Sequence, residues 1–217
     1  MKKFSDYKET EVNDFTPYEK IELGGHILKI LEVKIETIQG KNGPFEQLVL
    51  KFDMDDSDKQ AGYYARRFKS DAEKDALAAK WKGYYKVYIP KDDGTEEDGK
   101  TKVSFKTFIT CVEKSNEGYD WEKADWDEKT LVGKKFVGVF GIREFKNNED
   151  KVIYFTECRF ARSTQEDLEK ISIPKVKLVD GTYVDYTDWE DMRDEREGKN
   201  SESAETTVIE DEDDLPF

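Results

Sequence analysis

The residues best suited to chemistry lie between Gly62 and Lys91, where basic and aromatic side chains alternate. This stretch has eight basic residues against three acids, in a chain whose net charge is −14. On a strand, Tyr84, Lys86 and Tyr88 would share one face, with apolar side chains on the other. Nucleic-acid bases stack on exposed rings for roughly 1–3 kcal/mol each, and cations follow the phosphates. The pattern predicts a surface for single-stranded DNA, with the candidates Tyr64, Arg66, Arg67, Phe68, Lys69, Trp81, Lys82, Tyr84, Lys86 and Tyr88.

A second basic cluster falls on two strands expected later in the chain, where aromatic residues again interleave. If those strands flank the same groove, they add the secondary candidates Lys134, Lys135, Arg143 and Arg159. The alternative for both clusters is structural, with packed rings and lysines that keep an edge strand soluble. The local reversal of charge favours binding over that alternative.

Other chemistry finds little support in the sequence. The single histidine, His26, and the two cysteines, in no CxxC pattern, offer no zinc site, and we expect reduced thiols and a strand histidine without a special role. The acidic stretches 53–60 and 92–98 lack the glycine and closing glutamate of a calcium-binding EF-hand loop, which favours solvated turns. We therefore expect neither an enzyme nor a cofactor; a nuclease would need metal-dependent turnover.

The elements that must position these residues are mainly strands. Alternation predicts strands over residues 24–39, 45–54 and 62–69, then a helix from Ser70 to Lys80 and an edge strand or flap over 84–90. A helix with its apolar stripe between Phe105 and Val112 follows, and then strands over 134–145 and 151–160. This order is that of an OB-fold, a five-stranded barrel with a helix between strands three and four.

Charge divides the chain into three parts. The last 33 residues, 185–217, carry 14 acids and three basic residues, and so −11 of the net charge. Such a segment buries too little apolar surface to order itself, so we expect a disordered tail. The predicted organisation is an N-terminal arm (1–23), an OB-like domain (24–184) with an insertion at about 70–100, and the tail (185–217). The tail ends in the docking tip Asp211, Glu212, Asp213, Asp214, Leu215, Pro216 and Phe217.

The docking tip resembles the C-terminal tip of bacterial single-stranded DNA-binding proteins, which docks partners of replication and repair. The body is similar to single-stranded DNA-binding proteins of bacteriophages that infect Gram-positive hosts. The likeness rests on Gly24-Gly25-His26, FKTFITCVEKSNEGYDW (105–121), LVGKKFVGVFGIREF (131–145), KVIYFTECRFARS and IPKVKLV, and covers most of residues 24–179. This resemblance implies an OB-type core.

The residues and the resemblance together predict a protein that coats single-stranded DNA without sequence preference in phage replication or recombination. It would recruit replication or recombination proteins through its tip. The rival hypothesis is an adaptor, or a DNA-mimic inhibitor, that acts through its acidic tail. With no apolar run for a membrane span or a signal peptide, we expect residence in the bacterial cytoplasm and no membrane partner. Oligomeric state stays open.

Overall fold

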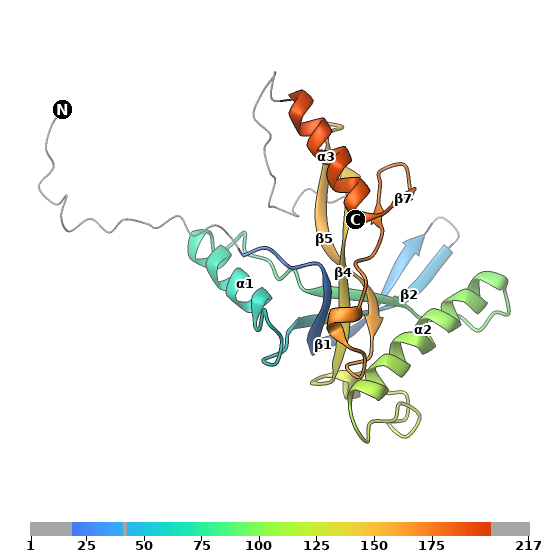
Figure 1. The fold of residues 1–217 in the computed structure, drawn as a ribbon. Coiled ribbons are helices and arrows are strands. Elements are labelled where there is room, and N and C mark those ends of the chain that lie inside the picture. Colours follow the sequence, from blue (N-terminus) through green and yellow to red (C-terminus); the bar gives the residue numbers. More distant parts are fainter. Residues whose placement is uncertain (1–18, 41–42, 201–217) are drawn as a thin grey trace, which may run out of the picture.

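The computed structural model describes residues 19–40 and 43–200, with side chains through residue 196. Within them, seven strands form one sheet, accompanied by three α-helices and two short 3-10 helices (Figure 1). The elements are β1 (Gly24–Gly40), β2 (Gly43–Met54), α1 (Tyr63–Lys74), β3 (Tyr84–Tyr88), α2 (Glu96–Ser115), η1 (Glu128–Leu131), β4 (Lys135–Lys146), β5 (Val152–Arg162), η2 (Leu168–Lys170), β6 (Val176–Lys177), β7 (Tyr183–Val184) and α3 (Tyr186–Asn200).

The sheet has the order β3-β2-β1-β4-β6-β7, and β5 pairs with β4. The long strand β1 changes neighbours along its length, because residues 24–29 pair with β4 and residues 28–40 pair with β2. The prediction of a mainly β fold with a helix between β3 and β4 is confirmed. The prediction of a barrel is wrong, since β3 and β5 do not pair and the sheet stays open. The side chain of Tyr85 on β3 packs instead against the rings of Phe108 and Phe136, both 5.9 Å away between centroids.

The core lies on the concave side of the sheet, under helix α2. Its fully buried side chains come from β1, β2, α2 and β4, and include Leu28, Ile30, Leu50, Phe52, Phe108, Val112, Phe136 and Phe140. Helix α2 begins at the N-cap Thr95, whose hydroxyl accepts the N–H of Asp98 at 3.1 Å. It ends at Asn116, whose amide donates to the carbonyls of Val112 and Lys135. These contacts fix the helix to the first residue of β4.

Residues 62–69 form a helix, so the prediction of a third strand there is wrong. The carboxylate of Asp53 accepts the N–H groups of Tyr64 at 2.8 Å and Ala65 at 3.1 Å, which supplies partners for the first turn of α1. Helix α1 ends at Lys74, and Ser70 lies inside it rather than at its start. The true third strand is β3, expected as a flap in an insertion, which packs Val87 into the core.

The predicted tail boundary at residue 185 is also wrong, because residues 186–200 form helix α3. Trp189 is 1 % exposed and packs with Ile142, Val176 and Leu178 in a second, smaller core. Its indole N–H donates to Glu144 Oε1 at 2.8 Å. One buried ring in an acidic segment thus outweighs the composition of its neighbours. Residues 201–217, with the docking tip, lie outside the described residues, as does most of the expected N-terminal arm.

Candidate nucleic-acid interface

The convex face of β1, β2 and β3 carries a row of aromatic rings and cations. As the alternation predicted, Tyr84 and Tyr88 point outward, 42 % and 58 % exposed, while Val87 is buried at 5 %. The register sets Lys51 of β2 opposite Tyr84 on this same face. We call the row the ring–cation stripe, and it comprises Phe68, Trp81, Lys51, Tyr84, Lys86, Tyr88 and Phe45.

Side-chain contacts join the members at each end of the stripe, and strand β3 connects the two ends. The rings of Phe68 and Trp81 lie 6.0 Å apart between centroids, and the ammonium of Lys51 lies 4.8 Å above the Trp81 ring. At the other end, the rings of Tyr88 and Phe45 meet edge to face at 5.2 Å. Rings and cations therefore alternate along one path that bases and phosphates can follow.

Local backbone geometry holds the Trp81 end of the stripe in place. The Trp81 indole N–H is shared between the carbonyls of Phe52, at 3.1 Å, and Gly83, at 3.2 Å. A Cβ atom at Gly83 would lie 2.5 Å from the Phe52 carbonyl oxygen, so only glycine lets the chain pass this close to β2. The ring is thus held with one side near the core, 6.4 Å from the Tyr64 ring, and with the ammonium of Lys51 above it.

The same face carries both lysines and glutamates, and the lysines of β2 and β3 lie nearer to the rings than the glutamates do. Lys34 pairs with Glu36 at 2.5 Å, and that hydrogen bond raises the pKa of Lys34. Lys51 lies 3.9 Å from Glu32, at the limit of an ion pair. These carboxylates lie on β1, one strand beyond the rings. A phosphate that approaches Lys51 or Lys86 can replace such exposed, weakly held partners.

The structure separates the other predicted site residues from the stripe. Tyr64 is buried at 7 % and packs edge to face on Phe52, so it is a core residue and the prediction of a stacking ring there is wrong. Arg66 pairs with Glu19 at 2.6 Å, and Arg67 lies 3.5 Å from the Tyr63 hydroxyl. Of the two remaining candidates, Lys69 lies 4.0 Å from Glu73 on α1, and Lys82 follows Trp81 in the segment before β3.

The second basic cluster contacts other parts of the protein. Lys135 pairs with the buried Asp55 at 2.8 Å, and Lys134 lies 4.6 Å above the Tyr119 ring. Arg143 and Arg159 both pair with Glu157, at 3.8 and 3.3 Å. Burial raises the pKa of Glu157, and the cations beside it counteract that rise. These four residues therefore have partners outside the stripe and do not extend it, against the prediction of one shared groove.

Residues 163–175 cover the same convex face where it continues onto β4. A Cβ at Gly25 would lie 3.0 Å from Ile171, and one at Gly141 would lie 3.0 Å from Pro174. These residues therefore lie against the segment. On the face of β2 and β3, by contrast, Tyr84, Lys86 and Tyr88 of β3 are exposed, while Val49 and Gln47 of β2 are buried at 3 % and 6 %. The open face ends where the covering segment begins.

Sequence reasoning missed Phe45 and Lys51. Both lie on the face of β2 opposite Leu48 and Leu50, so alternation placed them outward. Their position beside Tyr84 and Tyr88 follows only from the register between β2 and β3.

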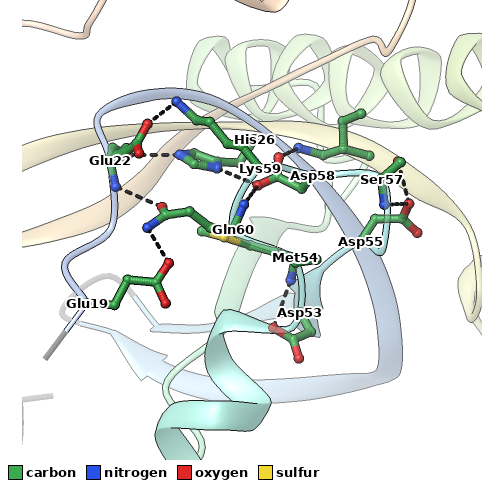
Figure 2. Close-up of polar contacts among 12 residues, drawn as sticks. Glu19, Glu22, His26, Asp53, Met54, Asp55, Ser57, Asp58, Lys59 and Gln60 are labelled. Atoms are coloured by element: carbon green, nitrogen blue, oxygen red, sulfur yellow. Dashed lines mark hydrogen bonds and ion pairs between the residues drawn. The ribbon is translucent and has the colours of Figure 1, made fainter. Parts of the chain in front are cut away.

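Sequence reasoning also missed the buried polar network around His26 (Figure 2). His26 Nδ1 lies 2.9 Å from Asp58 Oδ1, and Nε2 lies 2.9 Å from the Glu22 carbonyl. The same aspartate accepts the N–H groups of Ile27 and Gln60, at 2.7 and 2.8 Å. Burial raises the pKa of Asp58, but these hydrogen bonds outweigh burial and lower it.

This network is structural rather than catalytic. His26 is 0 % exposed and both of its ring nitrogens face acceptors, so neither can take a proton from a substrate. The acidic loop 53–60 is therefore not the solvated turn we expected, because Asp53, Asp55 and Asp58 are all buried and paired. Across the residues with described positions, no group of three metal-ligating side chains is found.

Comparison of the sequence with known proteins does not assign this chain to a family. No protein-family model and no curated protein matches this chain. In the part of the chain that the structure describes, no helix is long and apolar enough to cross a bilayer.

Proposed function

We propose that this chain binds single-stranded DNA without sequence preference through the ring–cation stripe. In this proposal it coats exposed strands during phage replication or recombination and recruits partner proteins through its docking tip. The observation that carries the proposal is the continuity of the stripe, in which neighbouring rings and cations run from Phe68 to Phe45. Every base has a face that stacks on a ring, so such a surface does not select a sequence.

The exposed rings of Tyr84 and Tyr88 favour a single strand over a duplex. The rings of Tyr84 and Tyr88 lie four residues apart on β3, a distance of about 13 Å for an extended strand, and Lys86 lies between them. Each ring can therefore stack on a separate unpaired base. Bases within a duplex are stacked on each other and cannot reach protein rings without being unpaired.

Titration of labelled oligo-dT, duplex DNA and RNA of the same length tests the proposal. We expect tight binding to oligo-dT. The slope of log K against log salt concentration should be about −0.7 for each phosphate neutralised. Weak binding to the duplex is the expected control. An adaptor or an inhibitor acting through the acidic tail would show no affinity for oligo-dT, and that result would refute the proposal.

The tail needs a deletion that respects helix α3. Removing residues 185–217 would also remove Trp189, which is buried in the fold. Residues 201–217 contain seven acids and no basic residue, so their deletion removes competing charge alone. We expect this deletion to strengthen binding to oligo-dT, most of all at low salt. Equal affinities at low salt would contradict competition between the tail and DNA.

Removal of Phe217 alone tests the docking tip. A terminal ring and its carboxylate fit a small apolar pocket with a basic rim. We expect this deletion to leave affinity for oligo-dT unchanged and to abolish capture of a purified replication or recombination partner. Unchanged capture would refute docking by the tip while leaving DNA binding untouched.

A further inference from the structure

A groove of about 410 Å³ lies between helix α2 and the end of strand β5. One wall is the stretch of α2 from Lys106 to Lys114, and the other is the end of β5 with the turn after it, where Arg162, Ser163 and Glu166 lie. We call it the α2–β5 groove. It is separate from the ring–cation stripe, because no residue of that stripe lines it.

Short polar contacts hold the two walls of the α2–β5 groove together. The Ser115 hydroxyl donates to the Cys111 carbonyl at 2.6 Å and accepts the N–H of Thr164 at 3.0 Å. The Cys111 thiol, one turn earlier on α2, lies 3.6 Å from the Ala161 carbonyl oxygen of β5. The groove is therefore fixed by the fold, and a ligand that enters it does not have to order its walls.

Cations outnumber acids in the α2–β5 groove, although the whole chain carries a net charge of −14. Lys106, Lys114 and Arg162 line it, and Glu166 is the one acid among the lining residues. Within the described part of the chain, neither lysine forms an ion pair. Arg162 lies 3.8 Å from Glu166, and both side chains are about half exposed, so this pair is weak.

Hydroxyl groups lie among these cations. Ser163 is only 4 % exposed, and its oxygen accepts the N–H of Gln165 at 3.1 Å. Its own hydrogen has no acceptor among the described residues, so it can donate to a ligand in the groove. Thr110 lies four residues from each lysine on the same side of α2. Lysine, arginine, serine and threonine are the side chains that bind the phosphates of nucleic acids.

Spacing and a neighbouring ring indicate which anion fits. Lys106 and Lys114 lie eight residues apart, about 12 Å along the helix axis. One small anion cannot contact both, whereas a chain with a charge at every link can. A second groove of about 430 Å³ shares Arg162 and Glu166 with the first and contains Phe160, a ring that is 47 % exposed. A ring beside cations suits a nucleic acid better than an acidic peptide, because a base can stack on it.

We propose that the α2–β5 groove binds a second segment of the single-stranded DNA that the ring–cation stripe holds. The DNA backbone contacts Lys106, Lys114 and Arg162, and a base stacks on Phe160. This inference rests on the proposed function and adds a contact that only a longer strand reaches. A short strand on the stripe leaves the groove empty.

Oligo-dT of two lengths separates the two sites in the full-length protein. Because one OB-type surface takes roughly 4–16 nucleotides, we compare oligonucleotides of about six and about 30. Lys106→Ala/Lys114→Ala should bind the short one as the wild type does. For the long one, it should reduce the slope of log K against log salt concentration by about 1.4, or two phosphates at about 0.7 each.

The matched control is Lys100→Ala/Lys123→Ala, which removes the same charge outside the groove, at lysines that pair with Glu96 and Asp120. We expect this control to leave the slope unchanged, and circular dichroism to show that both variants fold. A wild-type slope for Lys106→Ala/Lys114→Ala would overturn the second site and leave DNA binding by the stripe intact. A wild type without affinity for either oligonucleotide would instead refute the proposed function.

The ring has its own test in the same titration. Phe160→Ala should lower affinity for the long oligo-dT by about fivefold or more, because one stacked base is lost, and should not affect the short one. Unchanged affinity for the long oligo-dT would overturn the assignment of the ring to a base.

Acetylation of lysines, followed by mass spectrometry, locates the strand directly. We expect the long oligo-dT, and not the short one, to protect Lys106 and Lys114, while Lys123 reacts equally with and without DNA. Protection of Lys51 of the stripe without protection of these two lysines would refute the second site. If deletion of residues 201–217, and not DNA, changes their reactivity, the groove holds the acidic tail and the inference is wrong.

Discussion

Two regions of one convex face carry similar side chains but use them differently. On β2 and β3, the rings of Tyr84 and Tyr88 are exposed and Lys86 faces solvent between them. On β4 and β5, Arg143 and Arg159 surround the carboxylate of Glu157. The first region leaves its stacking surfaces available, whereas the second uses its charges within the fold.

The difference shows that a count of basic residues does not locate a binding surface. What matters is the nearest partner of each cation. A guanidinium paired with a half-buried carboxylate, as Arg159 is with Glu157, gains less from a phosphate because it must first leave its present partner. An ammonium whose carboxylate partner is exposed and distant, such as Lys51 at 3.9 Å from Glu32, loses less when it turns to a phosphate.

Loss of the rings should produce the largest change in binding. Because each stacked base contributes roughly 1–3 kcal/mol, Tyr84→Ala/Tyr88→Ala should lower affinity for oligo-dT by about a hundredfold or more. The matched control is Tyr183→Ala, a ring 53 % exposed beside Arg159. Fluorescence anisotropy of labelled DNA measures both. A comparable loss in the control would erase the distinction between the two regions.

Loss of Trp189 should produce the largest change in stability. Its removal leaves a cavity in the second core and takes one of two hydrogen bonds from the buried Glu144, which keeps Arg196, so Trp189→Ala should lower the free energy of unfolding by about 3–5 kcal/mol. Tyr88→Ala, on the open face, should change it by about 0.5 kcal/mol or less. Urea denaturation followed by circular dichroism compares the two. Equal effects would show that α3 does not belong to the folded domain.

Stability should depend on pH through Asp55 and Lys135. Burial raises the pKa of Asp55, but its bonds with Lys135 and Ser57 prevail and lower it from 3.8 to about 2. A folded pKa below the unfolded value gives stability that is present above about pH 4 and is lost as the pH falls towards 2. This contribution is on the order of 2 kcal/mol.

The matched variant is Asp55→Asn, which should be less stable at neutral pH and lose less stability on acidification. Urea denaturation at several pH values between 5 and 2 measures both proteins. Parallel pH profiles would show that this ion pair does not provide the dependence.

The smallest expected effect is that of a single cation on salt dependence. Lys86→Ala should reduce the slope of log K against log salt by about 0.7, which corresponds to one phosphate contact. Arg143→Ala should leave the slope unchanged, because Arg143 already pairs with Glu157. Binding isotherms at several salt concentrations separate the two. A reduced slope for Arg143→Ala would extend the DNA path onto β4.

Local pattern predicted the strands well and their environment poorly. The alternation of Tyr84, Lys86 and Tyr88 against Tyr85 and Val87 requires only the two-residue period of a strand, and the structure has it. Residues 62–69 were predicted as a strand because their sequence holds no N-cap. The first turn of helix α1 bonds instead to the carboxylate of Asp53, which lies on β2 before the loop. The boundary of the tail was predicted wrongly at residue 185, because the acidic composition around Trp189 outweighed the single apolar ring that anchors helix α3.

The sequence by itself determined which side chains alternate on β1, β2 and β3, and where the charge accumulates, because both depend on local order along the chain. Only the tertiary structure decided that Phe45 and Lys51 join the rings of β3, since strand register is set by partners distant in sequence. It also decided that Lys135 and Arg159 turn to buried or half-buried carboxylates. A cation pairs with the closest carboxylate in space, and that neighbour is fixed by folding.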